Sequence, residues 1–328
     1  MNISLSKNEW DPLKTVIVGI ADDARIPWMD PSLRMVNYAD KLSVKDIKTG
    51  LYPQQVIDEA NEDLEIFCTF LRQMGVEVLR PDKSFVPKYY NYCPRDTVLV
   101  HDDKILATPS PLRARVGEYK AMEEHLKRFA EITVAPNFNT YSMYNTKCIG
   151  DPNVLALQDT YPCFDAANIL RANDDIFYLL SNSGNNAGYM YLESLMPNKR
   201  VHKLQGIYSY MHLDSTLAFL REGLLLANPA RIKHIEQLPD ILRSWDIIWA
   251  PEPFDIGHYP GYCNASKWVS VNLFSVNENL VVVEEHQTEL RDLLERKGIA
   301  CAMLPMRHAR TLGGCFHCVT LDLVRSHK

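Results

Sequence analysis

The feature that most constrains the fold is a pattern that recurs five times along the 328 residues. In each copy a helical pattern ends and a short apolar or β-branched run follows: FLRQMGVEVLRPD, HLKRFAEITVAPN, YLESLMPNKRVHKLQG, DILRSWDIIWAPEP and LLERKGIACAMLPM. Between the copies lie paired runs of alternating apolar residues joined at acidic or amide-rich turns, which is typical of β-hairpins: TVLVHDDKILATP, ANILRANDDIFYLL, STLAFLREGLLLAN and WVSVNLFSVNENLVVVEE. The pattern of each unit therefore predicts strand, strand, helix, strand.

A unit of this size cannot cover its own apolar strands, whereas five units arranged in a ring bury them together. A doubly wound α/β sheet is the competing architecture. It requires single strands alternating with helices and a glycine-rich phosphate-binding turn, and the sequence shows neither. We therefore predict an α/β fold in which residues 1–328 form a single, ring-like domain.

Composition limits the partners of such a domain. A formal net charge of −6 argues against a surface for nucleic acid or for an anionic membrane. No apolar run approaches the length of a membrane span, and the first residues, MNISLSKNEWDPLK, lack the pattern of a signal peptide. Eight cysteines are too few for a disulfide framework, so reduced thiols in a cytoplasm are expected.

Two long, turn-rich and aromatic segments interrupt the repeating pattern. They span residues 20–53 and 137–162 and include WMDPSLRMVNY and FNTYSMYNTKC. Connections of this length inside a compact domain are usually functional lids or mobile segments. The alternative, that they only wrap the outside of the domain, is equally compatible with the sequence.

Polar residues recur where the predicted hairpins begin, and in a ring these positions would face the central axis. CPRDTVLV, CFDAANILR, YMHLDSTLAFL and GGCFHCVTLDL place there Arg95, Asp96, Asp165, His212, Asp214, Cys315 and Cys318. Taken singly, each has an ordinary explanation. An aspartate before a strand is most often a turn residue, a histidine is most often structural, and most free cysteines are small buried hydrophobes. Recurrence at matching positions of different units favours a shared site.

The C-terminal stretch GGCFHC also raises the alternatives of a metal site and a redox pair. No second paired-ligand cluster at zinc-finger spacing accompanies it, and the cysteines lead into a strand rather than a helix, so neither alternative is favoured. Cysteine, histidine and aspartate together indicate covalent catalysis. Three carboxylates would raise the pKa of a nearby thiol, which makes sense if the substrate is a planar guanidinium whose N–H donors suit carboxylates. Attack by sulfur on a guanidino carbon is the inferred reaction.

At these residues the sequence resembles the arginine:glycine amidinotransferase family, within the guanidino-modifying enzymes that include arginine deiminases. The resemblance covers nearly the whole chain, through NEWDPLKTVIVG, PRDTVLV, FDAANILRA, MHLDSTLAFL with LANPARI, SKWVSVN and GGCFHCVTLDL. It implies a five-bladed α/β propeller (the pentein fold) of pseudo-fivefold ββαβ modules. The residues of several of these blocks are similar to those of bacterial amidinotransferases of natural-product and toxin pathways.

The resemblance also implies roles for single residues. Cys318 resembles the nucleophile, His212 the general acid and base, and Asp165 the residue that orients the histidine. Asp96 and Asp214 would bind the guanidinium of the donor, and Arg231 and Ser266 would bind its carboxylate. Met211 would gate the site, and Cys315 receives no role. The implied reaction is ping-pong: arginine transfers its amidino group to Cys318, ornithine leaves, and an acceptor amine takes the group. No metal or organic cofactor is expected, and a homodimer is expected by resemblance alone.

Departures from the family pattern leave the acceptor open. Ala265 stands where glycine-specific relatives often have serine, and Ser209 replaces a more usual asparagine. Glycine and a biosynthetic-intermediate amine are both candidates, the second in secondary-metabolite or toxin biosynthesis. Two rival hypotheses remain at this point: a hydrolase related to the arginine deiminases that yields citrulline, and a non-catalytic arginine-binding protein.

Overall fold

Five separate three-stranded sheets form the framework of the structure, which is a computed structural model describing residues 5–38, 43–138, 140–148, 151 and 154–327. In chain order of their middle strands, the sheets are β17 (Thr320–Arg325), β1 (Leu13–Val18) and β4 (Glu77–Leu79); β5 (Val98–His101), β6 (Lys104–Ala107) and β7 (Ile132–Val134); β8 (Ile169–Ala172), β9 (Asp175–Leu179) and β10 (Arg200–Leu204); β11 (Leu217–Arg221), β12 (Leu224–Ala227) and β13 (Asp246–Trp249); and β14 (Phe274–Asn277), β15 (Leu280–Glu284) and β16 (Ala300–Leu304). In every sheet the first two strands pair antiparallel and the last two pair parallel. The mixed α/β content and the four predicted hairpins are confirmed.

The residue types at the predicted hairpin turns match the backbone conformation that the turns adopt. Asp102 and Asn173, at the hairpins of the second and third sheets, and Gly223, at that of the fourth, all have positive φ angles of 60°, 62° and 77°. Tight two-residue turns require such angles, which aspartate, asparagine and glycine tolerate best. The first sheet is different, because β1 pairs with β17 from the far end of the chain rather than with a neighbouring strand. This closure joins the two ends of the sequence.

Helices follow the second strand of each sheet. They are α2 (Gln54–Gln73), α3 (Glu123–Leu126), α4 (Asn186–Leu195), α5 (Asp240–Arg243) and α6 (Thr288–Arg296), with α1 (Pro31–Val36) and α7 (Ala309–Leu312) elsewhere. In α2 the buried residues Val56, Ala60, Leu64, Phe67 and Leu71 recur every three or four positions and form one apolar face. Two of the five predicted helices, α3 and α5, are single turns.

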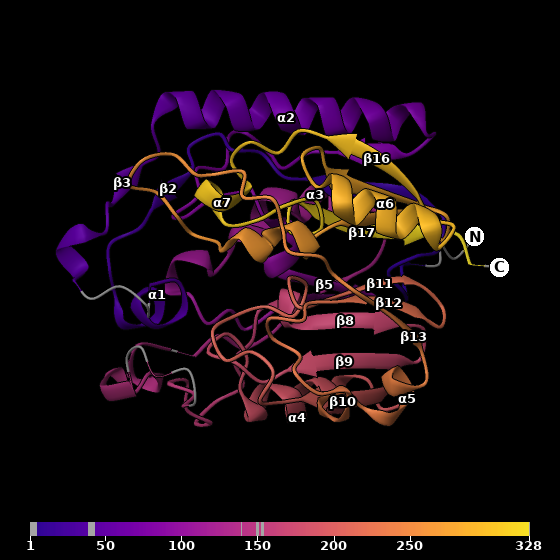
Figure 1. Cartoon of the computed structure of the whole chain (residues 1–328). Helices are drawn as coiled ribbons and strands as arrows, with labels where there is room; N and C mark the ends of the chain where they lie inside the picture. The colour runs from indigo at the N-terminus through magenta and orange to yellow at the C-terminus, as the bar shows by residue number, and fades with distance from the viewer. Residues whose placement is uncertain (1–4, 39–42, 139, 149–150, 152–153, 328) are drawn as a thin grey trace.

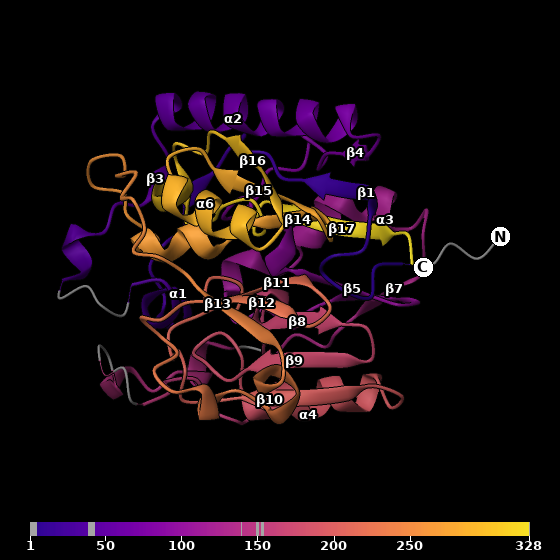
Figure 2. The same cartoon turned by 45° about the vertical axis from the view of Figure 1, so that its right-hand side comes forward.

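The helices lie outside the strands. Figure 1 shows α2 along the top and α4 and α5 along the bottom, with the sheets between them. The turned view of Figure 2 shows α6 beside β16, with α2 above them. Both chain ends lie at one end of the molecule, and α1, β2 (Arg25–Ile26) and β3 (Gly50–Leu51) lie at the other. Within the described residues, no helix combines the length and the apolar character needed to cross a bilayer.

Hydrophobic clusters connect each sheet to its neighbours. One cluster joins the first and second sheets through Ile17 and Val98, and successive clusters join the second to the third, the third to the fourth and the fourth to the fifth. The largest cluster joins the fifth sheet back to the first, through Phe274 and Val16. Each apolar sheet face is thus buried against another sheet, as expected for units that cannot bury themselves.

The two long connecting segments lie near α1. Residues 20–53 contain α1 and the β2–β3 pair, and they contribute Val36 and Asn37 to the wall of the cavity described below. Residues 137–162 contact α1 through a short 3₁₀ turn at Thr140–Met143. Parts of both predicted segments, residues 39–42, 139, 149–150 and 152–153, lie outside the described residues.

Candidate active site

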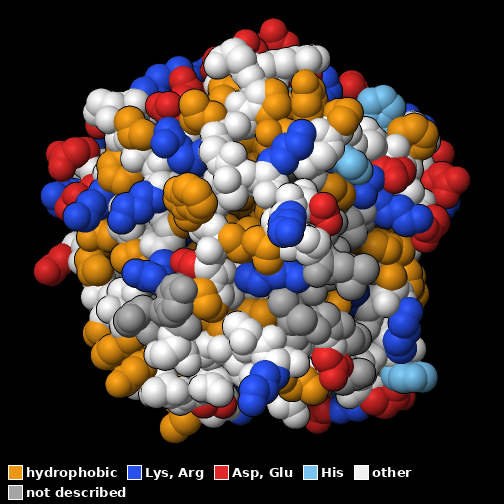
Figure 3. All heavy atoms as spheres, turned by 90° about the vertical axis from the view of Figure 1, so that its left-hand side faces the viewer, with side chains coloured by type: hydrophobic (Ala, Val, Ile, Leu, Met, Phe, Trp, Pro, Cys, Tyr) orange, Lys and Arg blue, Asp and Glu red, His pale blue; other side chains and the backbone are white. Residues whose placement is uncertain are grey.

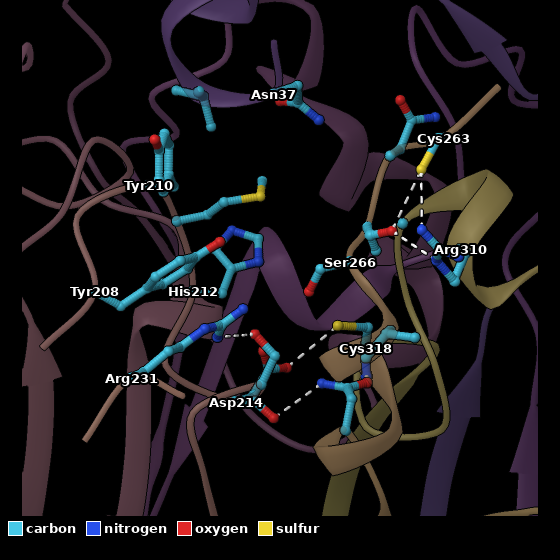
Figure 4. Close-up of a pocket in the computed structure, with 18 residues that line it drawn as sticks. Asn37, Tyr208, Tyr210, His212, Asp214, Arg231, Cys263, Ser266, Arg310 and Cys318 are labelled. Carbon is cyan, nitrogen blue, oxygen red and sulfur yellow. Dashed lines mark hydrogen bonds between the residues drawn. The ribbon is translucent and has the colours of Figure 1, made fainter. Parts of the chain in front are cut away.

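A cavity of about 500 Å³ opens beside the predicted nucleophile. Its lining includes six of the eight residues selected from the sequence: Met211, His212, Asp214, Arg231, Ser266 and Cys318. The other two, Asp96 and Asp165, line a smaller hollow that also contacts Met211 and His212. Figure 4 shows Cys318 and Arg231 on opposite sides of Asp214, with His212 above them. The structure therefore brings all eight residues to one region.

The side chains around the thiol are placed by the starts of the first strands of the sheets. Asp96 ends a 3₁₀ turn before β5, Asp165 caps a turn before β8, His212 and Asp214 precede β11, and Cys318 precedes β17. The remaining sheet supplies Asn272, which follows the 3₁₀ turn Lys267–Val271 before β14. Five equivalent positions in five sheets thus meet at one place, and this is why residues far apart in the sequence become neighbours.

Cys318 is held by its backbone and by one carboxylate. Its N–H donates to Asn272 Oδ1 at 2.9 Å, and its thiol lies 3.3 Å from Asp214 Oδ2. Hydrogen bonding to the Cys93 thiol, followed by burial and the charge of Asp214, raises the pKa of Cys318 well above the usual value, although His212 opposes this shift. In the empty site, the sulfur is therefore a neutral thiol at pH 7.

We expect alkylation of Cys318 by iodoacetamide to be slow at neutral pH and to rise only above the pH range of an ordinary thiol. A raised pKa means that the thiolate, which is the reactive form, appears at higher pH. A bound guanidinium opposes the carboxylates and should shift the profile toward lower pH. Mass spectrometry of the Cys318 peptide measures the rate, and Cys318→Ala gives the background from the other seven thiols. A midpoint at or below that of free cysteine in the empty protein would contradict this assignment.

His212 lies between two carboxylates. Its Nε2 is 3.1 Å from Asp165 Oδ2, and its Nδ1 is 3.7 Å from Asp96 Oδ1. Burial lowers the pKa of His212, but Asp96, Asp165 and the Cys318 thiol raise it by more, so the net pKa lies well above the usual value. Asp165 is itself fixed by Ser110, whose hydroxyl donates to Asp165 Oδ1 at 2.9 Å. The imidazole is therefore a cation at pH 7 and has a proton to give.

Asp96 is supported from behind by a buried ion-pair network that the sequence analysis missed. Arg115 donates to Asp96 Oδ2 and, at 2.7 Å, to Glu118 Oε2, and all three side chains are buried. Burial raises the pKa of Asp96 in spite of His212 and Arg115. The other carboxylate oxygen, Asp96 Oδ1, has no hydrogen-bond partner among the described residues. A buried acceptor without a partner is costly, so this oxygen is suited to an N–H donor of a ligand.

The pKa of Asp214 is shifted in the opposite direction to that of Asp96. Burial alone would raise its pKa, but hydrogen bonding and charge from His317, and then His212, hold the pKa at about 2. His317 Nδ1 lies 2.8 Å from Asp214 Oδ2, and its Nε2 lies 3.3 Å from Glu9 Oε2. Asp214 therefore stays ionised beside Cys318. From the sequence, the GGCFHC stretch presents His317 only as a possible metal ligand and gives it no catalytic role.

Arg231 supplies a partly buried positive charge at the other side of the cavity. Its Nη1 donates to Ser215 Oγ at 2.7 Å and Thr216 Oγ1 at 2.8 Å, and its guanidinium lies 3.6 Å from the centre of the Tyr208 ring. Burial lowers the pKa of Arg231, which remains far above neutrality. Within the described residues no carboxylate forms an ion pair with it. A ligand carboxylate would satisfy this charge.

The remaining lining residues are less constrained. Ser266 caps the 3₁₀ turn before β14, and Met211 adjoins His212 in both hollows. Arg310, a second arginine of the lining that was not predicted, is held by Asp255 and by the carbonyl of Ala265. Figure 3 shows the face that carries α1, β2 and β3, where Lys and Arg side chains lie near the middle and also toward the edge, with acidic side chains among them.

A metal centre at GGCFHC is not supported by the geometry. Both ring nitrogens of His317 face carboxylates, and the described residues place Cys315, His317 and Cys318 in no group with ligand spacing. One such group does occur in the described part of the chain, at Glu284, Glu285 and His286, and none of these residues lines the cavity. Glu284 there accepts hydrogen bonds from Gln287 and His286. That cluster is explained by its own contacts.

Comparison with known proteins identifies the class. Inosamine-phosphate amidinotransferase 1 of Streptomyces griseus is 39% identical over 345 residues, which cover 99% of this chain and 98% of the relative. The mitochondrial glycine amidinotransferase of Gallus gallus is 33% identical, covering 98% of this chain and 82% of that protein. No model of a protein family matches the chain. The chain belongs to the amidinotransferase family and is a transferase.

Solved structures agree with this membership. The S. griseus inosamine-phosphate amidinotransferase has a TM-score of 0.94 and 38% identity, covering 100% of this chain and 98% of that chain. SxtG, an amidinotransferase of Microseira wollei in the saxitoxin biosynthetic pathway, has a TM-score of 0.90 and 28% identity, again covering 100% and 98%. The similarity therefore extends over the whole fold.

Proposed function

We propose that this protein transfers the amidino group of L-arginine to an amine acceptor through a covalent intermediate on Cys318. The observation that carries the proposal is the distribution of charge in one cavity. A thiol, two carboxylates and an imidazolium meet at one side, and at another lies an arginine that pairs with no carboxylate of the described residues. This distribution complements a molecule with a guanidinium at one end and a carboxylate at the other, as in arginine.

The first half-reaction follows from the protonation states. The guanidinium of arginine would bind between Asp214, which is ionised, and Asp96, whose Oδ1 has no hydrogen-bond partner in the described part of the chain. Its charge stabilises the thiolate, so the Cys318 proton is released when substrate arrives. Sulfur then forms a bond to the guanidino carbon. The imidazolium of His212 donates its proton to the departing nitrogen, and ornithine leaves.

The second half-reaction reverses these roles. Neutral His212, oriented by Asp165, accepts a proton from the acceptor amine as that amine attacks the amidino carbon. The C–S bond breaks and Cys318 is regenerated. The amidino carbon is cationic and already electrophilic, so these residues account for both steps by binding, orientation and proton transfer.

The fold supports the convergence on which the site depends. We propose that the five sheets are the blades of a five-bladed α/β propeller, the pentein fold, with the site at its axis. The support is the closed succession of hydrophobic clusters, in which the fifth sheet packs against the first. The equivalent placement of Asp96, Asp165, Asp214, Asn272 and Cys318 is a second line of support.

The acceptor is proposed to be the amine of a biosynthetic intermediate in secondary-metabolite or toxin biosynthesis, in the cytoplasm. Identity to the inosamine-phosphate amidinotransferase is higher than identity to the glycine amidinotransferase, at 39% against 33%. The eight free cysteines are compatible with a reducing compartment. Incubation with arginine and a panel of amines, including glycine, lysine, ethanolamine and aminocyclitol phosphates, tests the proposal by product analysis. Ornithine that appears in proportion to an amidinated amine supports transfer, whereas citrulline would establish hydrolysis instead.

We expect Arg231→Gln to raise the KM for arginine by about 10²-fold with a smaller change in kcat, because it removes a charge-assisted, forked hydrogen-bond donor. Agmatine, which is arginine without its carboxylate, tests the cause. The variant should lose the preference for arginine over agmatine, since the carboxylate then has no partner. Arg221→Gln, on β11 but outside the cavity, is the matched control. An unchanged preference in Arg231→Gln would show that Arg231 does not bind the donor carboxylate.

A further inference from the structure

A second thiol contacts the proposed nucleophile from behind. Cys93 ends the segment before the 3₁₀ turn Pro94–Asp96, and its side chain is 1% exposed. Each thiol affects the pKa of the other, since their interaction raises the pKa of Cys318 and lowers that of Cys93. They come from different sheets, and a separation of 225 residues gave no sign in the sequence that they would meet.

Gly314 shows how closely the two cysteines pack. A Cβ atom added at Gly314 would lie 2.6 Å from Cys93 Sγ, 2.7 Å from Cys318 Cβ and 3.5 Å from Cys318 Sγ. Both side chains therefore border the space that a single methyl group would fill. Formation of a disulfide bond brings two sulfurs to about 2.0 Å, so two thiols that border the same methyl-sized space need only a local movement.

The two thiols differ in access. Cys318 lines the cavity and is reached from solvent, whereas Cys93 is absent from the cavity lining. Cys93 is also anchored, because its carbonyl oxygen accepts a hydrogen bond from Arg115 Nη2 at 2.9 Å. An oxidant that enters the cavity therefore meets Cys318 first and leaves Cys93 as a reduced thiol beside the oxidised sulfur. This is the arrangement of an attacked cysteine and a resolving cysteine.

We propose that Cys93 is a resolving thiol, which closes a reversible disulfide with Cys318 when a hydroperoxide enters the cavity. After the Cys318 thiol loses its proton, the sulfur attacks one peroxide oxygen and the O–O bond breaks, which gives a sulfenic acid. The second oxygen takes up a proton and leaves as water from hydrogen peroxide, or as an alcohol from an organic hydroperoxide. The Cys93 sulfur then attacks the Cys318 sulfur. The S–S bond forms, the S–O bond breaks, and the hydroxide leaves as water with the proton of Cys93. In sum, two thiols and one hydroperoxide give one disulfide and two molecules of water for hydrogen peroxide.

The disulfide would protect the sulfur from further oxidation. A sulfenic acid without a resolving thiol proceeds to sulfinic and sulfonic acids, which thiol reductants do not reverse. The effect of the disulfide on turnover rests on the proposed function, since blocking Cys318 stops the reaction only if Cys318 is the nucleophile. Arginine without an acceptor should protect against the disulfide, because the amidino group then occupies the sulfur.

The test treats the protein with hydrogen peroxide, removes the peroxide and compares samples with and without dithiothreitol. For the native sequence we expect a peptide pair joined through Cys93 and Cys318 in non-reducing mass spectrometry, and turnover that returns on reduction. In Cys93→Ala and in the conservative Cys93→Ser, each compared with its own untreated rate, the recovered fraction should fall roughly fivefold or more. Cys315→Ala, which removes an equally buried thiol three positions from Cys318, should recover as the native sequence does.

Two results would overturn the resolving role. One is sulfinic acid on Cys318 in the native sequence with no joined peptides, and the other is equal recovery in both Cys93 variants. A different result separates this inference from the proposed function: joined peptides with undiminished turnover would support the thiol pair but contradict Cys318 as the nucleophile.

Discussion

Cys318→Ala is expected to lower amidino transfer by at least about four orders of magnitude, on the scale of losses seen when a covalent nucleophile is removed. Among the described lining residues the other thiol is Cys263, whose sulfur contacts the Ala265 carbonyl and Arg310 instead of Asp214, and Cys93 is absent from the lining. Arginine should still bind, since Asp96, Asp214 and Arg231 remain in place. Steady-state ornithine release measures the turnover, and isothermal titration with arginine measures the binding.

Cys315→Ala is the matched control for this prediction. Cys315 is 1% exposed and lies three positions from Cys318. The backbone N–H groups of both cysteines donate to Asn272 Oδ1. Its removal tests whether the loss comes from missing sulfur or from disturbed packing in the same turn. Turnover within about threefold of the native sequence is expected. If Cys318→Ala keeps more than a trace of activity, the covalent route does not operate here.

The second large effect is expected for His212→Asn, which should reduce turnover by about 10²- to 10⁴-fold, the range of general acid–base catalysis. The loss should depend on the leaving group. Canavanine releases an aminooxy group of much lower basicity than the amine of ornithine, so it needs a proton less. If His212 donates that proton, the variant loses less with canavanine than with arginine.

His202→Asn serves as the control for the histidine. His202 Nε2 also lies against a carboxylate, 2.7 Å from Asp175 Oδ1, but it lies on β10 and is absent from the cavity lining. Removing this second histidine–aspartate pair should leave both donors' rates nearly unchanged. Equal losses with arginine and canavanine in His212→Asn would indicate that His212 positions groups without transferring a proton.

Position within the repeating unit made much of this site predictable. Asp96, Asp165, Asp214 and Cys318 were recognised because each begins the first strand of a unit, and the structure brings them together. The same rule would also have found Asn272, which fixes the backbone of Cys318. The hairpin turns were predictable for a local reason: aspartate and asparagine tolerate the positive φ angles that Asp102 and Asn173 adopt.

The missed residues act through partners that are remote in sequence. His317 joins Asp214 to Glu9, which lies 308 positions away, and Arg115 contacts Asp96 through a buried ion pair. Their roles depend on burial and on which carboxylate lies opposite, and neither property is local to the sequence. The pairing of β1 with β17 is of the same kind. Two consequences for the chemistry, a neutral thiol and a protonated histidine in the empty site, appear only once these contacts are assembled.

The account depends most on sulfur attacking the guanidino carbon of arginine. Mass spectrometry of the protein after incubation with arginine alone, in the absence of an acceptor amine, tests this step directly. The predicted result is one amidino group on the peptide that carries Cys318, formed together with one equivalent of ornithine and discharged when an acceptor is added. An unmodified Cys318 alongside released ornithine, or an amidino group on a different residue, would contradict the account.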